Sequence, residues 1–234
     1  MTETPASPPP GRRALLQIGP LKLTGLAAVI AQFVLGAGIV LLFVWQRPHF
    51  GPLWISGAMW IAFIAYWSAN ARNTAPTASS ESSRSRAVHG IVLDLAILLG
   101  FLHFAPLGGS WRPEGWGYVV AGLVAQALGV LLAIWARRVL GRNWSGRVEI
   151  KVGHELVRTG PYRRLRHPIY SAMLLMMAGT ALVSGHWHGL LGFGLMLGLY
   201  ARKLAMEERR LRETFGAEWE AWRRHSWALI PGLV

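Results

Sequence analysis

The sequence contains no cysteine, and it has few charged residues for its length. The absence of cysteine excludes disulfides, thiolate-bound zinc and a cysteine nucleophile. Charged residues make up 15% of the 234 residues, whereas a soluble domain usually contains about 25%. This deficit, together with 53% hydrophobic residues and twelve tryptophans, indicates an integral membrane protein, because tryptophan favours the membrane–water interface.

The formal net charge of +13 would indicate nucleic-acid binding in a soluble protein. In a membrane protein the positive-inside rule explains it more simply, because lysine and arginine gather in cytoplasmic loops. Three loop regions are basic, and they hold Arg12, Arg13 and Lys22, then Arg72, Arg84 and Arg86, then Arg137, Arg138, Arg142, Arg147 and Lys151. The opposite loops carry only Arg47 and Arg112. We therefore expect both termini on the cytoplasmic side and no nucleic-acid partner.

Four apolar segments in the first 140 residues are each close to the about 20 residues with which a helix crosses a bilayer. They cover residues 23–45, 53–69, 88–107 and 116–140. The sequence therefore predicts four transmembrane helices within residues 22–140, after a polar, proline-rich, disordered tail at residues 1–21. Asp94 lies inside the third segment and is expected to face other helices rather than lipid, while His103 is expected near the far interface.

A second apolar stretch covers residues 169–204 and is interrupted at residues 184–189. Each half is about 15–17 residues long, or about 23–26 Å as a helix. This pattern predicts a helical hairpin that returns the chain to the cytoplasmic side, followed by a charged interfacial helix. His186 and His188 lie in the interruption. No further ligand lies nearby in the sequence, so we interpret them as turn residues and expect no metal site.

Between these apolar regions, residues 156–172 read LVRTGPYRRLRHPIYSA. Polar groups at this density are costly beside a bilayer unless they bind something. Gly160 and Pro161 predict a turn. Pro168 suits the first turn of a helix, which places His167 near a helix N-terminus where backbone N–H groups favour an anionic or oxygen-bearing ligand.

Tyr162 and Tyr170 could hold a cation or stack on a planar ring at this membrane face. The residues alone leave a second interpretation equally open, in which the stretch is an interfacial anchor. Its tyrosines would then lie at headgroup depth, and the arginines would bind lipid phosphates. The arginines concerned are Arg163, Arg164 and Arg166.

The order of several motifs resembles the isoprenylcysteine carboxyl methyltransferase family and the related phospholipid N-methyltransferases. The motifs are Gly160-Pro161-Tyr162, Arg166-His167-Pro168-Ile169-Tyr170, Glu207-Glu208 and Phe215-Gly216. The upstream Gly141-Arg142-Asn143-Trp144-Ser145 is also similar to bacterial members. The likeness covers about residues 140–231, and its specificity lies in the joint order and spacing, because any one tripeptide would be weak.

The resemblance implies an all-α protein: a polytopic transmembrane helix bundle with a C-terminal hairpin and a cytoplasmic pocket for S-adenosylmethionine. The absence of a GxGxxG motif after a strand agrees with this, because no Rossmann domain is then expected. Residues 141–234 would form the catalytic region. By motif, the residues that would bind the cofactor are Leu156, Gly160, Pro161, Tyr162, His167, Pro168, Tyr170, Glu207 and Glu208. A carboxylate suits the amino or ribose hydroxyl groups of the cofactor.

The reaction implied by the resemblance is an in-line displacement at a methyl carbon, in which the protein supplies alignment and a dry pocket. A carboxylate or thiolate acceptor needs little base catalysis, whereas an amine must lose a proton, for which His167 or Glu207 is a candidate. The family commonly has an arginine, thought to orient a substrate carboxylate, four residues before the first glutamate. Here Lys203 takes that place, and lysine lacks the planar fork of arginine.

We therefore expect a multi-pass protein of a bacterial inner membrane or an equivalent membrane, with its cofactor site facing the cytosol. Its substrate would be a lipophilic or prenylated molecule that enters from the membrane lipid, and the implied reaction is carboxyl O-methylation of an isoprenylcysteine-like acceptor. The alternatives within enzymes are N-methylation of a phospholipid and S-methylation of a small thiol. An alternative of another class is a non-catalytic membrane scaffold or lipid-binding protein.

Overall fold

The computed structural model describes residues 16–18, 21–23, 51–70, 77–80, 83–101, 109–111, 115–144, 149–151 and 156–232. Three features named above lie wholly or largely outside the described residues: the predicted tail at residues 1–21, residues 24–45 of the first predicted span, and His103.

The described chain is mainly helical, which confirms the predicted all-α fold. The helices are α2 (Gly51–Asn70), α3 (Ser83–Phe101), α4 (Gly117–Leu140), α5 (Pro168–Ser184), α6 (Trp187–Phe215) and α7 (Ala217–Arg223), with short 3-10 turns η2 (Gly141–Asn143) and η3 (Gly160–Arg163). Two antiparallel pairs of short strands accompany them, β1 (Leu16–Ile18) with β2 (Leu21–Leu23) and β3 (Thr77–Ser80) with β4 (Glu149–Lys151).

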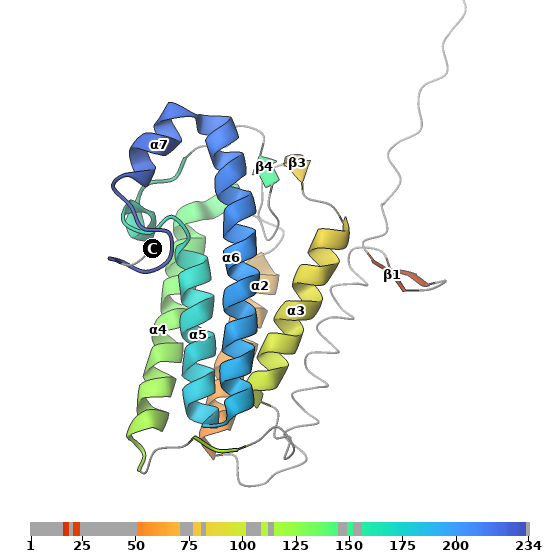
Figure 1. The fold of residues 1–234 in the computed structure, drawn as a ribbon, viewed down its shortest axis with the longest axis vertical. Helices are drawn as coiled ribbons and strands as arrows, with labels where there is room; N and C mark the ends of the chain where they lie inside the picture. Colours follow the sequence, from red (N-terminus) through yellow and green to blue (C-terminus); the bar gives the residue numbers. More distant parts are fainter. Residues whose placement is uncertain are drawn as a thin grey trace, which may run out of the picture.

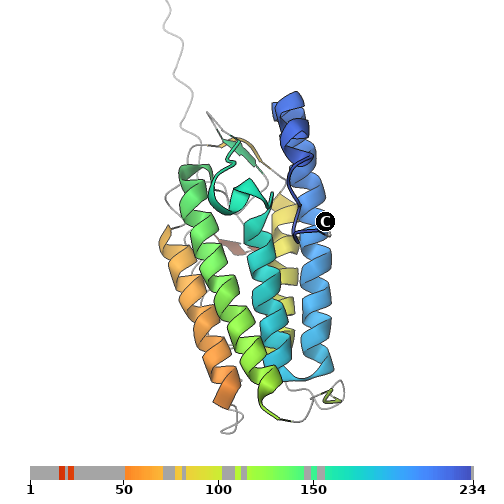
Figure 2. The same ribbon diagram turned by 90° about the vertical axis from the view of Figure 1, so that its left-hand side faces the viewer.

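The long helices form one bundle in which α5 is central. Helices α4 and α6 flank α5, α2 packs on α4, and α3 packs on α6 (Figure 1). Figure 2 shows α2, α4, α5 and α6 in a row, with α3 behind them. Helix α7 and the C-terminal segment lie at one end of the bundle, at the top of Figure 1, and the α5–α6 turn lies at the other.

Among the described residues, α2, α4 and α6 are long and apolar enough to cross a membrane, while α5 and Val88–Phe101 of α3 are shorter apolar helices. The predicted spans 53–69 and 116–140 agree closely with α2 and α4, and Asp94 lies half-buried on α3. Helix α6 differs from expectation, because it does not end near residue 204 but continues to Phe215. Its 29 residues would extend about 43 Å, so its polar end reaches past a hydrocarbon layer of about 30 Å.

Glycines allow α4 and α5 to approach closely. A Cβ atom on Gly179 of α5 would lie 2.4 Å from the carbonyl oxygen of Gly122 on α4, and one on Gly122 would lie 2.7 Å from the carbonyl oxygen of Gly179. About two helical turns further along α4, a Cβ on Gly129 would lie 2.8 Å from the carbonyl oxygen of Ala172. Small residues at such a contact let helix backbones pack directly against each other in a membrane.

A buried polar cluster joins α2, α4 and α5 inside the apolar bundle. The Ser56 hydroxyl donates to Gln126 Oε1 at 2.6 Å, and Gln126 Nε2 donates to the Ser56 carbonyl at 2.8 Å. The Trp60 indole N–H donates to Thr180 Oγ1 at 2.9 Å, and Thr180 donates to the Met176 carbonyl at 3.0 Å. Hydrogen bonds of this kind hold helices together where the hydrophobic effect cannot.

Replacing Gln126 with leucine should lower the free energy of unfolding by about 1 kcal/mol, because it removes both bonds to Ser56 and leaves two buried polar groups without that partner. Thermal unfolding in detergent micelles measures the effect. Val124→Leu on the exposed face of α4 serves as the control and should leave the midpoint nearly unchanged. Equal midpoints for the two variants would contradict a stabilising role for the cluster.

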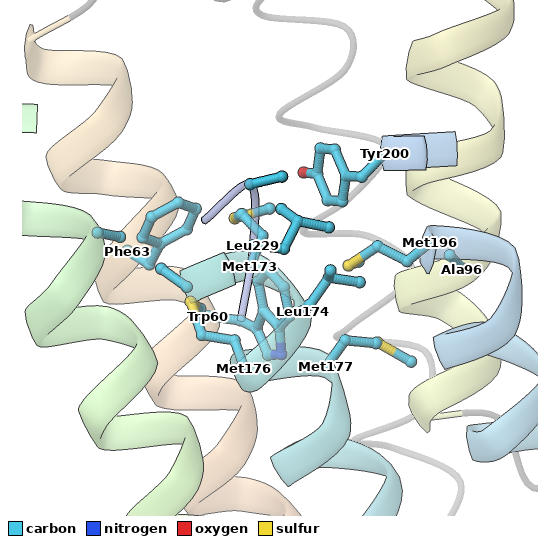
Figure 3. Packing of buried hydrophobic residues seen from close by; sticks show 13 residues of the cluster. Trp60, Phe63, Ala96, Met173, Leu174, Met176, Met177, Met196, Tyr200 and Leu229 are labelled. Atoms are coloured by element: carbon cyan, nitrogen blue, oxygen red, sulfur yellow. The ribbon is translucent and has the colours of Figure 1, made fainter. Parts of the chain in front are cut away.

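Methionines fill much of the apolar core. Met173, Met176 and Met177 of α5 pack with Met196 of α6 and with Trp60 of α2 (Figure 3). Unbranched methionine side chains adapt to the irregular spaces between crossing helices. Ala228 and Leu229 are buried in the same cluster, so the segment after α7 returns to the bundle and completes its core.

Candidate active site

The Gly160–Arg163 turn lies at the α7 end of the bundle. Gly160 has a φ of +56°, and a Cβ atom there would lie 2.8 Å from a methyl group of Val139 on α4. Both observations require glycine, since other residues rarely adopt positive φ. Pro161 and Tyr162 follow and are buried. The turn is therefore fitted tightly against the end of α4.

Tyr162 belongs to an aromatic cluster with Ala136 of α4 and with Trp219 and Trp222 of α7, and Leu156 packs against its edge. Burial raises the pKa of the Tyr162 phenol, and the negative charge of Glu207 raises it further. The phenol is therefore neutral at physiological pH, and it lies close enough to Glu207 to sense its charge.

Helix α5 begins at Pro168, with His167 in the position before it, as predicted. The His167 side chain is only 4% exposed. Its Nδ1 lies 3.8 Å from Glu207 Oε2, and its Nε2 lies 3.4 Å from Glu208 Oε1. Nε2 is buried and makes no hydrogen bond of good geometry within the described chain. The structure thus brings the His-Pro motif and the Glu-Glu pair together across the α5–α6 hairpin.

Tyr170 lies at the centre of this cluster. Its hydroxyl donates to Glu207, and its ring is parallel to that of His167 at a centroid distance of 5.3 Å. On its other side it stacks on Tyr200 of α6 at 4.8 Å. The Lys203 ammonium lies 5.6 Å from the centre of the Tyr170 ring, so Lys203 points into the same region.

The Glu208 carboxylate forms an ion pair with Arg166. The Arg166 Nε donates to Glu208 Oε1 at 2.8 Å. Burial alone would raise the pKa of Glu208, but hydrogen bonds and positive charge from His167 and Arg166 outweigh it and lower the pKa to about 2. Glu208 is therefore an anion throughout the physiological range.

The segment after α7 runs parallel to the residues that precede α5. Leu165 and Trp227 form a parallel bridge, the Arg166 N–H donates to the Trp227 carbonyl at 2.8 Å, and the His167 N–H donates to the Ala228 carbonyl at 3.1 Å. Sequence reasoning missed this element. Its only signal in the sequence is a short apolar run at residues 227–230, shortly after Arg223 and Arg224.

The predicted site residues fall into two groups. Five of them form the cluster: His167, Tyr170, Lys203, Glu207 and Glu208. The others lie beside it in packed positions: Pro168 begins α5, and Leu156, Gly160, Pro161 and Tyr162 belong to the turn under α7. Arg166, which belongs to the Arg166–Tyr170 motif but was not among the predicted site residues, also lies inside the cluster.

His186 and His188 lie at the opposite end of the hairpin. Their rings stack at 5.0 Å, both are buried, and His188 Nδ1 lies 2.8 Å from the Leu99 carbonyl oxygen. Within the described ranges, no three His, Cys, Asp or Glu side chains are grouped in a way that could hold a metal ion.

Comparisons with known proteins agree with the motif positions. The family model described as "Phospholipid methyltransferase" matches residues 118–218, a range that includes all five clustered residues. A protein of Oryza sativa subsp. indica named "Probable protein-S-isoprenylcysteine O-methyltransferase" is 29% identical over 121 residues, which are 50% of this chain and 63% of that protein.

Two further relatives carry similar names. "Protein-S-isoprenylcysteine O-methyltransferase" of Dictyostelium discoideum is 25% identical over 115 residues, or 48% of each chain. "Protein-S-isoprenylcysteine O-methyltransferase B" of Arabidopsis thaliana is 28% identical over 109 residues, or 45% of this chain and 55% of that protein. The chain thus matches less than two thirds of the length of these relatives. The comparisons confirm the predicted resemblance to the isoprenylcysteine carboxyl methyltransferase family.

Proposed function

We propose that this protein, as a relative of isoprenylcysteine and phospholipid methyltransferases, is an integral membrane enzyme that methylates a lipophilic acceptor. The observation that carries the proposal is the cluster of His167, Tyr170, Glu207 and Glu208 at one end of an apolar bundle. Carboxylates and a nearly buried histidine at such a place are costly unless they serve a ligand. S-adenosylmethionine would supply the methyl group as part of a sulfonium.

The residues of the cluster suit that cofactor. The Glu207 carboxylate can accept hydrogen bonds from amino or hydroxyl groups, and it offers negative charge to a sulfonium. The His167 ring lies between the two carboxylates, with Nδ1 3.8 Å from Glu207 Oε2 and Nε2 3.4 Å from Glu208 Oε1, so it would line the cofactor site beside Glu207. The turn at Gly160–Tyr162 would close the site from the α4 side, and the neutral phenol of Tyr162 adds no charge.

The acceptor proposed first is the carboxylate of an isoprenylcysteine-like molecule, in agreement with the names of the relatives. A carboxylate is already a nucleophile at neutral pH, so the protein has to orient it and exclude water rather than remove a proton. Lys203 is buried and lies one helical turn from Glu207 towards the apolar half of α6. Its charge would attract an anionic headgroup there.

A second candidate is N-methylation of a phospholipid, which the description of the matching family favours. Lys203 stands where the isoprenylcysteine family commonly has arginine, and a lysine cannot form the bidentate pair with a carboxylate. An amine acceptor would have to lose a proton, and His167 or Glu207 would be the base.

The proposed topology follows the charge of the loops. The α7 end of the bundle, with the candidate site, would face the cytosol, from which the cofactor would come. The acceptor would enter sideways from the lipid. Exposed tryptophans support a membrane boundary on α4: Trp116 and Trp135 are 19 residues, or about 28 Å, apart along the helix, close to the hydrocarbon thickness of about 30 Å.

The test is to incubate the purified protein with methyl-labelled S-adenosylmethionine and three acceptor panels: prenylcysteines, phospholipids and small thiols. Label should appear in a base-labile ester of a prenylcysteine. Label in phosphatidylethanolamine instead would favour the second candidate. A folded protein that neither binds S-adenosylhomocysteine nor labels any acceptor would overturn the enzyme proposal and favour a membrane scaffold.

A further inference from the structure

Arg166 is a largely enclosed cation beside the candidate site. Its side chain is 8% exposed, its Nε bonds Glu208 at 2.8 Å, and its Nη1 donates to the Ser226 carbonyl and lies 3.4 Å from the Arg223 carbonyl oxygen. A guanidinium held on both sides in this way cannot reach a phospholipid phosphate. Arg166 therefore acts through its contacts within the protein.

The backbone around Arg166 is fixed to the same C-terminal segment. The Arg166 N–H bonds the Trp227 carbonyl, the Trp227 N–H bonds the Arg164 carbonyl at 2.9 Å, and the Ser171 hydroxyl donates to the Leu229 carbonyl at 2.5 Å. The Arg166 side chain also bonds Glu208 and so connects this backbone pairing to α6. One residue therefore joins the start of α5, the polar end of α6 and the C-terminal segment.

The two neighbouring carboxylates differ in their surroundings. The Glu208 side chain is 17% exposed and has Arg166 and His167 against the same oxygen, Oε1. The Glu207 side chain is 33% exposed and accepts the Tyr170 hydroxyl. Glu207 is thus the more open of the two carboxylates.

We infer that Arg166 is a positioning residue that fastens Glu208 between the start of α5 and the C-terminal segment, which leaves Glu207 as the carboxylate that contacts the ligand. This inference rests on the proposed function, because the ligand is taken to be the methyl donor. Glu208 would not touch the ligand but would hold His167 in place through its contact with Nε2.

This role of Arg166 predicts a change in the pH dependence of ligand binding. The charged and titratable groups around Glu208 are Arg166 and His167 from the segment before α5 and Glu207 from α6 itself. Burial favours the protonated carboxyl of Glu208, and the contacts with His167 and with Arg166 both oppose this effect. Without Arg166 the pKa of Glu208 rises, so protonation releases His167 at a higher pH than in the wild type. Ligand affinity should then fall relative to wild type as the pH is lowered.

The experiment measures S-adenosylhomocysteine binding by calorimetry for the full chain in lipid nanodiscs between pH 8 and pH 5. Arg166→Gln should bind about tenfold more weakly than wild type at pH 5, with a smaller difference at pH 8. Arg166→Lys, which keeps the charge but lacks the rigid planar donors with which arginine bonds Glu208 and Ser226, should restore part of the affinity at pH 5. Arg163→Gln, an exposed neighbour, is the matched control and should follow wild type.

Two results would overturn the inference: Arg166→Gln binding like wild type at every pH, or a loss of affinity that does not change with pH, which a purely structural role would produce. If Arg166→Gln does not fold, the pH profile of Arg166→Lys decides in the same way. The double variant Arg166→Gln/Glu208→Gln should lose the added pH dependence. No binding by wild type would overturn the proposed function and this role with it, whereas failure of the Arg166 role alone leaves wild-type binding intact.

Discussion

Glu207→Gln should weaken S-adenosylhomocysteine binding by about a hundredfold and reduce methyl transfer at least as strongly. The substitution keeps the size of the side chain and removes its charge, and hydrogen bonds to a charged group contribute about 1.5–3 kcal/mol. Glutamine also turns one acceptor oxygen into a donor, which faces the Tyr170 hydroxyl. Calorimetry and a labelled-methyl assay measure the two effects separately.

Glu213→Gln is the matched control, because Glu213 lies on the same helix, is 60% exposed and pairs with Arg209 on the surface. It should bind like wild type, since an exposed i,i+4 pair contributes little. Unchanged affinity in a folded Glu207→Gln protein would remove Glu207 from the site. Equal losses in both variants would indicate a general effect of charge rather than a contact.

Gly179→Val should prevent the bundle from forming at its closest contact. The first atom of any side chain there would lie 2.4 Å from the Gly122 carbonyl oxygen and 2.8 Å from the Gln126 backbone nitrogen. Neither is a flexible side-chain end, so α4 and α5 would have to separate, with a loss of more than about 3 kcal/mol of stability. The expected result is little monodisperse protein and, for the milder Gly179→Ala, a clearly lowered unfolding midpoint.

Gly198→Ala on α6 is the control, because a Cβ atom there meets nothing within 4 Å. Alanine should raise stability slightly at this helical position. A Gly179→Ala protein with the wild-type midpoint would show that the α4–α5 contact can widen without cost, contrary to the packing described.

Patterns that depend on neighbouring residues were predictable from the sequence. The run 116–140 agrees with α4 because bilayer thickness sets the length of a spanning helix. The start of α5 at Pro168 follows from the chemistry of proline itself. The proximity of His167 and Glu207 could be predicted only by combining the expected hairpin between them with the resemblance of the motifs to a known family.

Pairings between distant residues were not predictable in this way. Arg166 and Glu208 are 42 residues apart, and a surface arginine beside two others looks like a lipid anchor until its partner is known. The Trp227–Leu165 pairing depends on the direction that the chain takes after α7. No periodic pattern in the sequence indicates this direction. The length of α6 was also missed. The sequence changes from apolar to charged residues near residue 204, where the helix leaves the apolar core, but the backbone continues as one helix to Phe215.

The continuity of α6 has a mechanical consequence. Met196 in the buried core and Glu207 in the candidate site lie on one unbroken helix, about 16 Å apart along its axis. No hinge between them can absorb a displacement, so the helix behaves as a rod. Any tilt or shift imposed on its apolar half moves the carboxylate as well, and the position of Glu207 is therefore set partly by how α6 packs in the apolar core.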